Sequence, residues 1–241
     1  MAGVKISSFT FAFNAILGGY PVAEAVMAVK PFVDETVAVD MSSTDRTREL
    51  LESVCDKVID CPWGEDPMKE SFLRHVQCSG DIVLLHEADE IFDPRLAETC
   101  CDLARQGHTN LQVWRIQVSQ NGQRIAVYPH PVHRVFPVGG HSPDPIPVVG
   151  PEHGYLWDLT RWFRDNYWDR RKACSKIWGP QRNVMVRDHF LQSPELSDAE
   201  LRILLQEPHW EWKVSPFALP EIIKPLVGMV RYSPTVEGWN S

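Results

Sequence analysis

Apolar and polar positions alternate in a regular way over the first half of the chain. Short apolar runs typical of buried strands lie at residues 4–11, 36–40, 58–59 and 81–85. Helical stretches are predicted between and after them, at residues 21–31, 45–55, 65–77 and 95–106. A chain that alternates strand and helix in this way predicts an α/β fold with a doubly wound, mostly parallel sheet flanked by helices.

The pattern changes after residue 110. Residues 111–118 and 124–128 flank the dipeptide Asn121-Gly122, which predicts a β-hairpin. Residues 129–151 are rich in proline and glycine, so we expect an irregular loop there. Residues 156–176 and 197–205 are predicted to be helical, and the Trp- and Pro-rich tail from residue 207 is expected to wrap the surface.

Composition indicates a soluble globular protein. Of the 241 residues, 44% are hydrophobic and 23% are charged. No apolar run approaches the ~20 residues of a membrane span, and the N-terminus lacks the pattern of a secretory signal. The six cysteines match no zinc-binding spacing, so we expect mostly reduced thiols in a cytoplasmic protein.

Charge is distributed unevenly along the chain. The net charge is −8, yet residues 161–187 hold eight basic and two acidic side chains, a local net charge of +6. This basic segment, which includes Arg161, Arg164, Arg170 and Arg171, favours a local anionic partner. Four interpretations stay open: a solvated helix face, phosphate binding, a nucleic-acid acceptor, or a peripheral membrane face with a lipid-linked acceptor.

Carboxylates gather directly after the apolar run at 81–85. The stretch LLHEADEIFDP places Glu87, Asp89, Glu90 and Asp93 within seven positions. Like charges this close repel, which a divalent cation with oxygen ligands would relieve; the alternative is a helix N-terminus that favours acids. Asp40 also follows a predicted strand, and the carboxyl ends of parallel strands meet at one edge where ligands bind.

Two of these segments resemble family 2 glycosyltransferases. VAVDMSSTDRTRELL is similar to the family's "vvDsgStDgT.ei" segment, and GDIVLLHEADEIFDP to its "GDyil.lDaDE.l.p" segment. The resemblance covers roughly residues 4–106. It implies a GT-A-like fold, with residues 1–110 as a nucleotide-sugar-binding half and 111–241 as an acceptor-side half of one compact domain. It also implies sugar transfer with inversion from a nucleoside-diphosphate donor, with UDP-type donors favoured.

The resemblance assigns donor-binding roles to several residues. Asp40 matches the acid that recognises the donor base, where its carboxylate can accept a hydrogen bond from a uracil imide. Ser43, Asp45 and Thr47 match the conserved turn and are expected to shape it. Phe9 and Thr10 are placed near the base pocket, at the end of the first strand. The family's basic residue before the acidic strand has two candidates out of register, Lys69 and Arg74.

The same resemblance implies a site for Mn²⁺ or Mg²⁺. Glu87 and Asp89 match the two acids of the D-x-D motif, with Asp89 as the direct ligand, and Glu90 matches the acid that follows. Glu87 departs from the family's aspartate by one methylene. His153 is expected as a further ligand. Three acids are candidates for the base that deprotonates the acceptor: Glu152, Asp158 and Asp144.

These observations predict a metal-dependent inverting glycosyltransferase that is cytoplasmic or peripheral to a membrane. An alternative within enzymes is a DNA-modifying glycosyltransferase that acts on a hydroxylated base, suggested by the basic segment. An alternative from another class is a non-catalytic sugar-nucleotide or nucleic-acid binding protein, suggested by the glutamate at position 87.

Overall fold

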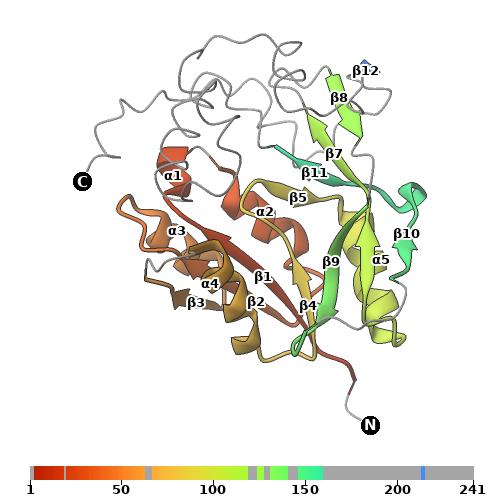
Figure 1. Cartoon of the computed structure of the whole chain (residues 1–241), viewed down its shortest axis with the longest axis horizontal. Coiled ribbons are helices and arrows are strands. Elements are labelled where there is room, and N and C mark those ends of the chain that lie inside the picture. Colours follow the sequence, from red (N-terminus) through yellow and green to blue (C-terminus); the bar gives the residue numbers. More distant parts are fainter. Residues whose placement is uncertain are drawn as a thin grey trace.

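A seven-stranded sheet forms the centre of the molecule (Figure 1). The computed structural model describes residues 3–18, 20–62, 67–118, 124–127, 131–140, 146–159 and 213–214. The strands of this sheet are β1 (Ile6–Ala12), β2 (Glu35–Asp40), β3 (Lys57–Asp60), β4 (Ile82–Leu85), β6 (Leu111–Val113), β9 (Val132–Pro137) and β10 (Val148–Val149). Their spatial order is β10-β6-β9-β4-β1-β2-β3.

Helices cover both faces of this sheet. They are α1 (Ala15–Gly18), α2 (Val22–Val29), α3 (Thr47–Val54), α4 (Pro67–Leu73) and α5 (Pro94–Arg105), with short 3₁₀ helices η1 (Arg74–Gln77) and η2 (Pro151–His153). Val29 of α2 and Leu96 of α5 join one apolar cluster, whereas Phe72 of α4 packs on a second cluster that contains Phe9 and Phe136. The sheet is therefore doubly wound, and its central strands β1, β2 and β4 are almost wholly buried on both faces.

The order of the parallel strands defines a switch point. β1 pairs in parallel with β2 on one side and with β4 on the other, and β2 pairs in parallel with β3. The chain therefore moves outward from β1 to β3 and returns to the other side of β1 through α4. Ligands of such sheets bind beyond the carboxyl ends of the strands at this point, here between β1 and β4.

A second, five-stranded sheet contains β5 (Glu90–Phe92), β7 (Arg115–Val118), β8 (Arg124–Val127), β11 (Leu156–Asp158) and β12 (Lys213–Val214). Its order is β12-β8-β7-β11-β5. Trp114 lies between β6 and β7, where the chain passes from the first sheet into the second. Strands from both halves of the sequence thus take part in both sheets.

Most of the predicted pattern is confirmed. The α/β class, the parallel order of the first four strands and the β7–β8 hairpin agree with the structure. None of the helices in the described ranges is long and apolar enough to cross a membrane. The cysteines at 55, 61, 78, 100 and 101 carry free thiols, and Cys174 lies outside the described residues.

Two predictions are wrong. Residues 129–151 were expected to be an irregular loop, but they contain β9, which lies between β4 and β6. Pro131 and Pro137 fall just before and at the end of this strand, where proline does not interrupt a ladder. The helix predicted from residue 156 begins instead as β11, because Leu156 and Trp157 pair with both β5 and β7.

The remaining second-half predictions lie largely outside the described residues. This holds for the rest of the segment 156–176, for the helix at 197–205 and for nearly all of the tail. The exception is β12, a two-residue strand that pairs with β8.

Candidate active site

The carboxyl ends of β2 and β4 flank the end of β1. Leu85, the last residue of β4, lies beside Phe9, and the His86 amide donates to the Phe9 carbonyl oxygen at 3.1 Å. β1 runs on to Ala12, which lies beside Asp40 at the end of β2. Since neighbouring strands are about 4.8 Å apart, β2 and β4 are separated by about 10 Å across β1. This edge therefore has room for a ligand that extends from Asp40 to the acidic residues after β4.

Asn14 ties the turns after β1 and β2 together. Its amide donates to Ser43 Oγ at 2.9 Å, and its side-chain oxygen accepts from the Thr44 amide at 2.7 Å. Asn14 has φ of 45°, a left-handed conformation that asparagine adopts more readily than most residues. The Ser43 amide lies 3.3 Å from both carboxylate oxygens of Asp40. These bonds fix the Asp40 carboxylate, which is 4% exposed as a residue, at the edge of the sheet.

The turn after β2 is further held by its own side chains. Asp45 Oδ1 accepts from the Thr47 amide at 2.9 Å, and Thr47 Oγ1 accepts from the Ile16 amide at 3.2 Å. Ser43 and these two residues thus shape the turn, in agreement with the role that the resemblance implies for them.

Glu90 is a buried carboxylate with two arginine partners. Arg134 of β9 donates from Nη2 to Oε1 at 2.6 Å and from Nε to Oε2 at 2.9 Å. Arg115 of β7 donates from Nη1 to Oε1 at 3.2 Å. The Glu87 amide also donates to Glu90 Oε2, at 3.0 Å. Two arginines, rather than a bound cation, therefore neutralise this acid. Glu90 thus has a structural role in holding β5 against β7 and β9.

The arginines extend these contacts into a row of alternating charges. Arg134 Nη2 also contacts Glu87 Oε1 at 3.2 Å, and Arg115 Nη1 contacts Asp158 Oδ2 at 3.6 Å. We call this set the charge row: Glu87, Arg134, Glu90, Arg115 and Asp158. It links the loop after β4 to the end of β11, so it joins the predicted donor side to the predicted acceptor side.

The pKa values of the two glutamates in the charge row are shifted in opposite directions. Burial acts to raise the pKa of Glu90, but the charge of Arg134 and its hydrogen bonds outweigh burial and lower that pKa. Burial of the carboxyl group, followed by the negative charge of Glu90, raises the pKa of Glu87 to about 8, while Arg134 opposes this. The Glu87 side chain still has 41% of its surface exposed, which moderates its desolvation but leaves the repulsion in place. A further positive charge near Glu87 would stabilise its ionised form.

Asp89 is 8% exposed and lies next to the start of β5. Its carbonyl oxygen accepts from the Leu159 amide at 2.9 Å, directly after β11. The acidic loop and the end of β11 are therefore neighbours, as a shared donor and acceptor site would require.

His86 and Thr10 are both buried at this edge. Both are at most 1% exposed, and neither Thr10 Oγ1 nor the two ring nitrogens of His86 has a hydrogen-bond partner in the structure. Burial lowers the pKa of His86 to about 4, so the ring is neutral. β1 continues to Ala12, one residue beyond the predicted strand, and Phe9 packs fully buried in the core, so the placement of Phe9 and Thr10 near the base pocket stays a prediction.

The predicted metal ligand set is not assembled as expected. No group of three or more His, Cys, Asp or Glu side chains suited to a metal ion is found in the described part of the chain. His153 Nδ1 contacts Thr99 Oγ1 of α5 at 3.3 Å, and its Nε2 contacts Glu152 Oε1 at 3.5 Å. Gly154, with φ of 111°, lies against Asp93 and fixes this segment at the start of α5. Among the described residues His153 forms no metal-binding group with the acids after β4, and its role as a ligand stays a prediction.

Glu87 and Asp89 fit a metal site that is completed by the substrate rather than by a third protein ligand. Glu87 and Asp89 offer oxygen ligands, and burial together with the nearby charge of Glu90 disfavours the ionised form of Glu87, which a bound cation would favour. Mg²⁺-type ions are commonly held by one or two carboxylates together with substrate phosphates. Two protein carboxylates completed by a diphosphate are consistent with this arrangement.

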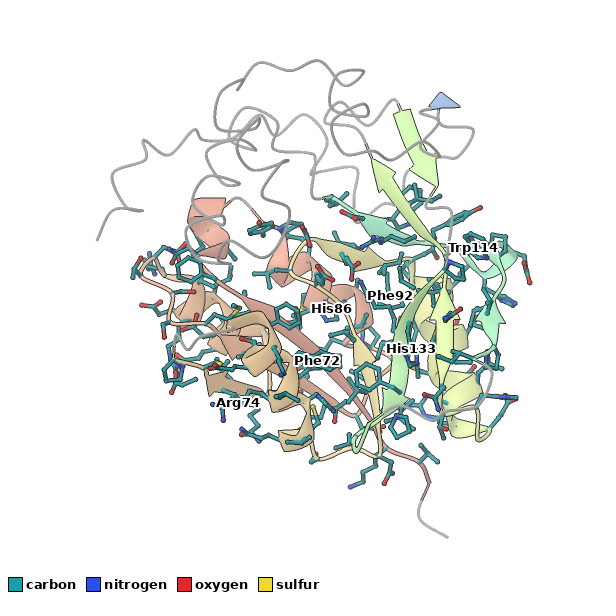
Figure 2. The ribbon with its side chains drawn as sticks, viewed as in Figure 1. Phe72, Arg74, His86, Phe92, Trp114 and His133 are labelled. Carbon is teal, nitrogen blue, oxygen red and sulfur yellow. The ribbon has the colours of Figure 1, made fainter. Side chains whose placement is uncertain are left out.

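Other predicted residues lie in different surroundings. Arg74 begins η1, and in Figure 2 it lies well apart from His86. η1 leads into the amino end of β4, so Arg74 lies away from the carboxyl ends of the strands, and its binding of the donor stays a prediction. Lys69 is exposed on α4, and its role stays a prediction. Glu152 is exposed beside His153, whereas Asp158 is buried in the charge row. Asp144 and the predicted patch of arginines lie outside the described residues: Arg161, Arg164, Arg170 and Arg171.

Sequence reasoning missed Arg115 and Arg134. Each lies within an apolar stretch, in VWRIQV and VHRVF. A single arginine inside a buried run needs an acidic partner, and four acids close together need cations. Those two signals taken together could have indicated the pairing.

Comparisons with known proteins agree with the sequence motifs. An uncharacterized glycosyltransferase of Rickettsia felis is 35% identical over 94 residues, which are 39% of this chain and 32% of the relative. One of Rickettsia bellii is 33% identical over 124 residues, which are 52% of this chain and 36% of the relative. The chain spans about one third of the length of these relatives. They confirm the resemblance to glycosyltransferases. No protein-family model matches the chain.

The solved structures that match this chain have lower sequence identity and low TM-scores. Glucosyl-3-phosphoglycerate synthase from Mycobacterium tuberculosis, in complex with Mn²⁺, UDP and glucosyl-3-phosphoglycerate, is 21% identical with a TM-score of 0.40. The match covers 47% of this chain and 44% of that one. A mycobacterial protein is 19% identical with a TM-score of 0.41, over 48% of this chain and 42% of that one. Values this low decide nothing about function.

Proposed function

We propose that this chain is a glycosyltransferase that moves a sugar, with inversion, from a nucleoside-diphosphate donor to an acceptor hydroxyl. A UDP-type donor and a divalent cation are part of the proposal. The observation that carries it is the placement of Asp40 and of Glu87 with Asp89 on either side of the end of β1, at the switch point of the sheet. The description of curated relatives as glycosyltransferases supports the same class of reaction.

Each group has a role that its chemistry allows. Asp40 would accept a hydrogen bond from the imide of the donor base. Glu87 and Asp89 would hold a Mn²⁺ or Mg²⁺ ion together with oxygens of the diphosphate. When bound, such an ion supplies charge neutralisation for the departing nucleoside diphosphate.

Asp158 is the better placed of the two described candidates for the base. It lies at the end of β11, next to Leu159, whose amide donates to the Asp89 carbonyl oxygen, and Arg115 Nη1 lies 3.6 Å from its Oδ2. Glu152 contacts His153 on the side of α5 instead. In the proposal, the acceptor hydroxyl approaches near Asp158 and gives up its proton there as it attacks the sugar.

A thermal-shift panel tests the binding part of this proposal. Uridine, guanosine, adenosine, cytidine and thymidine diphosphates would each be added with and without Mn²⁺. A ligand that binds the native state raises its stability by RT ln(1 + [L]/Kd), so UDP with Mn²⁺ should raise the Tm most. No shift with any nucleotide would overturn the proposal.

A second candidate is a sugar-nucleotide binding protein without catalysis. The glutamate that replaces the family's aspartate at position 87 favours it. Release of UDP from a UDP-sugar, measured with parent and with Asp158→Asn, separates the two candidates. Turnover that the variant loses supports the enzyme, whereas binding without turnover by the parent supports the binding protein.

A further inference from the structure

We infer that Arg134 is a positioning residue that holds Glu87 in the orientation needed to receive the cation and the donor. This inference rests on the proposed function and adds a residue to it from β9, outside both sequence motifs. It also accounts for how a glutamate can serve at a position where the family has an aspartate.

The geometry at Arg134 is that of a rigid fork. Two of its nitrogens bond to Glu90, at 2.6 and 2.9 Å, and Nη2 also reaches Glu87 Oε1 at 3.2 Å. Glu90 is 1% exposed, and its Oε1 also accepts from Arg115 Nη1. A planar guanidinium fixed in this way has little freedom, so its position determines where the Glu87 carboxylate lies.

Glu87 is the one member of the charge row with a largely open side chain. Its side chain is 41% exposed, against 1% for Glu90, 3% for Asp158, 10% for Arg134 and 16% for Arg115. The contact with Arg134 is at Oε1, so Oε2 remains available to a ligand. The Glu87 amide is anchored as well, by Glu90 Oε2. Glu87 is thus held at its backbone and at one carboxylate oxygen.

The contact with Arg134 matters more for a glutamate than for an aspartate, because glutamate has an extra methylene group. An unanchored glutamate has one more rotatable bond than aspartate and loses more side-chain entropy when it is fixed. Arg134 restricts that freedom before a ligand binds. Partners that orient metal-binding carboxylates in this way commonly contribute 10–100-fold to affinity.

A double-mutant cycle tests the inference by calorimetry, with UDP and Mn²⁺ as the probe. Arg134→Lys keeps a positive charge beside Glu90 but cannot bridge two carboxylates with a fork. We expect it to weaken binding about tenfold in the parent, and less than about twofold in a Glu87→Gln background. Equal losses in both backgrounds would overturn the inference. Arg115→Lys is the matched control, because Arg115 bonds to the same Glu90 and forms a further ion pair with Asp158, so its effect should be similar in both backgrounds.

Glu87→Asp gives a second test that leaves the Arg134–Glu90 pair intact. Shortening the side chain draws the carboxylate back from Arg134 but restores the family's own residue. The inference predicts weaker binding of UDP with Mn²⁺, by about tenfold, with an unchanged Tm. Unchanged or tighter binding would contradict it. Failure of the parent to bind UDP with Mn²⁺ would overturn the proposed function itself, which distinguishes the two failures.

Discussion

Arg134 and Glu90 join the two sheets of the molecule through a buried, two-pronged ion pair. Arg134 belongs to β9 in the seven-stranded sheet, and Glu90 belongs to β5 in the five-stranded sheet. The nitrogen–oxygen distances are 2.6 and 2.9 Å, and both residues are at most 8% exposed. A charge pair in this position fixes how the acidic loop between β4 and β5 lies against the sheet.

Removing the cation of this pair should destabilise the fold. Arg134→Met leaves Glu90 buried with Arg115 as its remaining cation, so we expect the free energy of unfolding to fall by about 3 kcal/mol. The measurement is urea-induced unfolding of parent and variant. Arg48→Met is the control, because Arg48 forms exposed ion pairs with Glu52 and Asp60, and it should cost less than about 1 kcal/mol. Equal costs for the two variants would contradict the structural role of Arg134.

Stability should depend on pH through Glu87. Its pKa is raised to about 8 in the folded protein, against an ordinary value of 4.5, so the folded state retains a proton that the unfolded chain releases. Proton binding therefore favours the folded state between these values, and the free energy of unfolding should fall as pH rises from about 4.5 to 8. Glu87→Gln should flatten this slope in urea titrations at several pH values. An identical slope in the variant would mean that Glu87 does not titrate in this range.

If Asp40 binds the donor base, its removal should weaken nucleotide binding selectively. Asp40→Ala should weaken UDP binding by about 1.5–3 kcal/mol, the range for a hydrogen bond to a charged group. Asp60→Ala is a matched control, because Asp60 ends the neighbouring strand β3 directly beside Asp40. Calorimetry of both variants with UDP and Mn²⁺ is the measurement. Parent-like affinity of Asp40→Ala would remove Asp40 from the site.

The parallel half of the fold could be predicted from sequence because its signals are local. Apolar runs, helix periods and the acids that follow β2 and β4 all lie within single segments. β9 could not be predicted in the same way, since its prolines indicate a loop when the partner strands β4 and β6 are unknown. The local sequence of β11 likewise favours a helix, because its pairing with β5 and β7 is a tertiary effect that no local pattern carries.

The site shows the same division between local and long-range information. Asp40 and the acids after β4 carry a motif, so the sequence alone placed them at one sheet edge. Arg134 follows Glu90 by 44 positions, and no spacing rule connects them. Part of the positive charge that the acidic cluster requires comes from Arg134 of the chain itself, which bonds to Glu90. The assignment of His153 rests on analogy alone, and in this structure its Nδ1 contacts Thr99 of α5.

The basic segment 161–187 gives a prediction from sequence alone. If its arginines bind a polyanionic acceptor, neutralising Arg161 with Arg164, or Arg170 with Arg171, should weaken oligonucleotide binding. The log–log slope of affinity against salt should also fall by about 0.7–0.9 for each lost phosphate contact. A salt titration of oligonucleotide binding, beside a donor titration, measures both effects. No detectable binding by the parent at low salt would exclude the nucleic-acid acceptor.

The central claim is that the carboxyl edge between β1 and β4 binds a nucleoside diphosphate together with a divalent cation. Calorimetric titration of UDP, with and without Mn²⁺, into the parent and Asp89→Asn tests it most directly. Asparagine has nearly the same shape as aspartate, so the variant should keep the parent's Tm. The account predicts Mn²⁺-dependent binding of UDP by the parent and loss of that dependence in Asp89→Asn. Binding by the variant with the parent's affinity and the parent's response to Mn²⁺ would contradict the account.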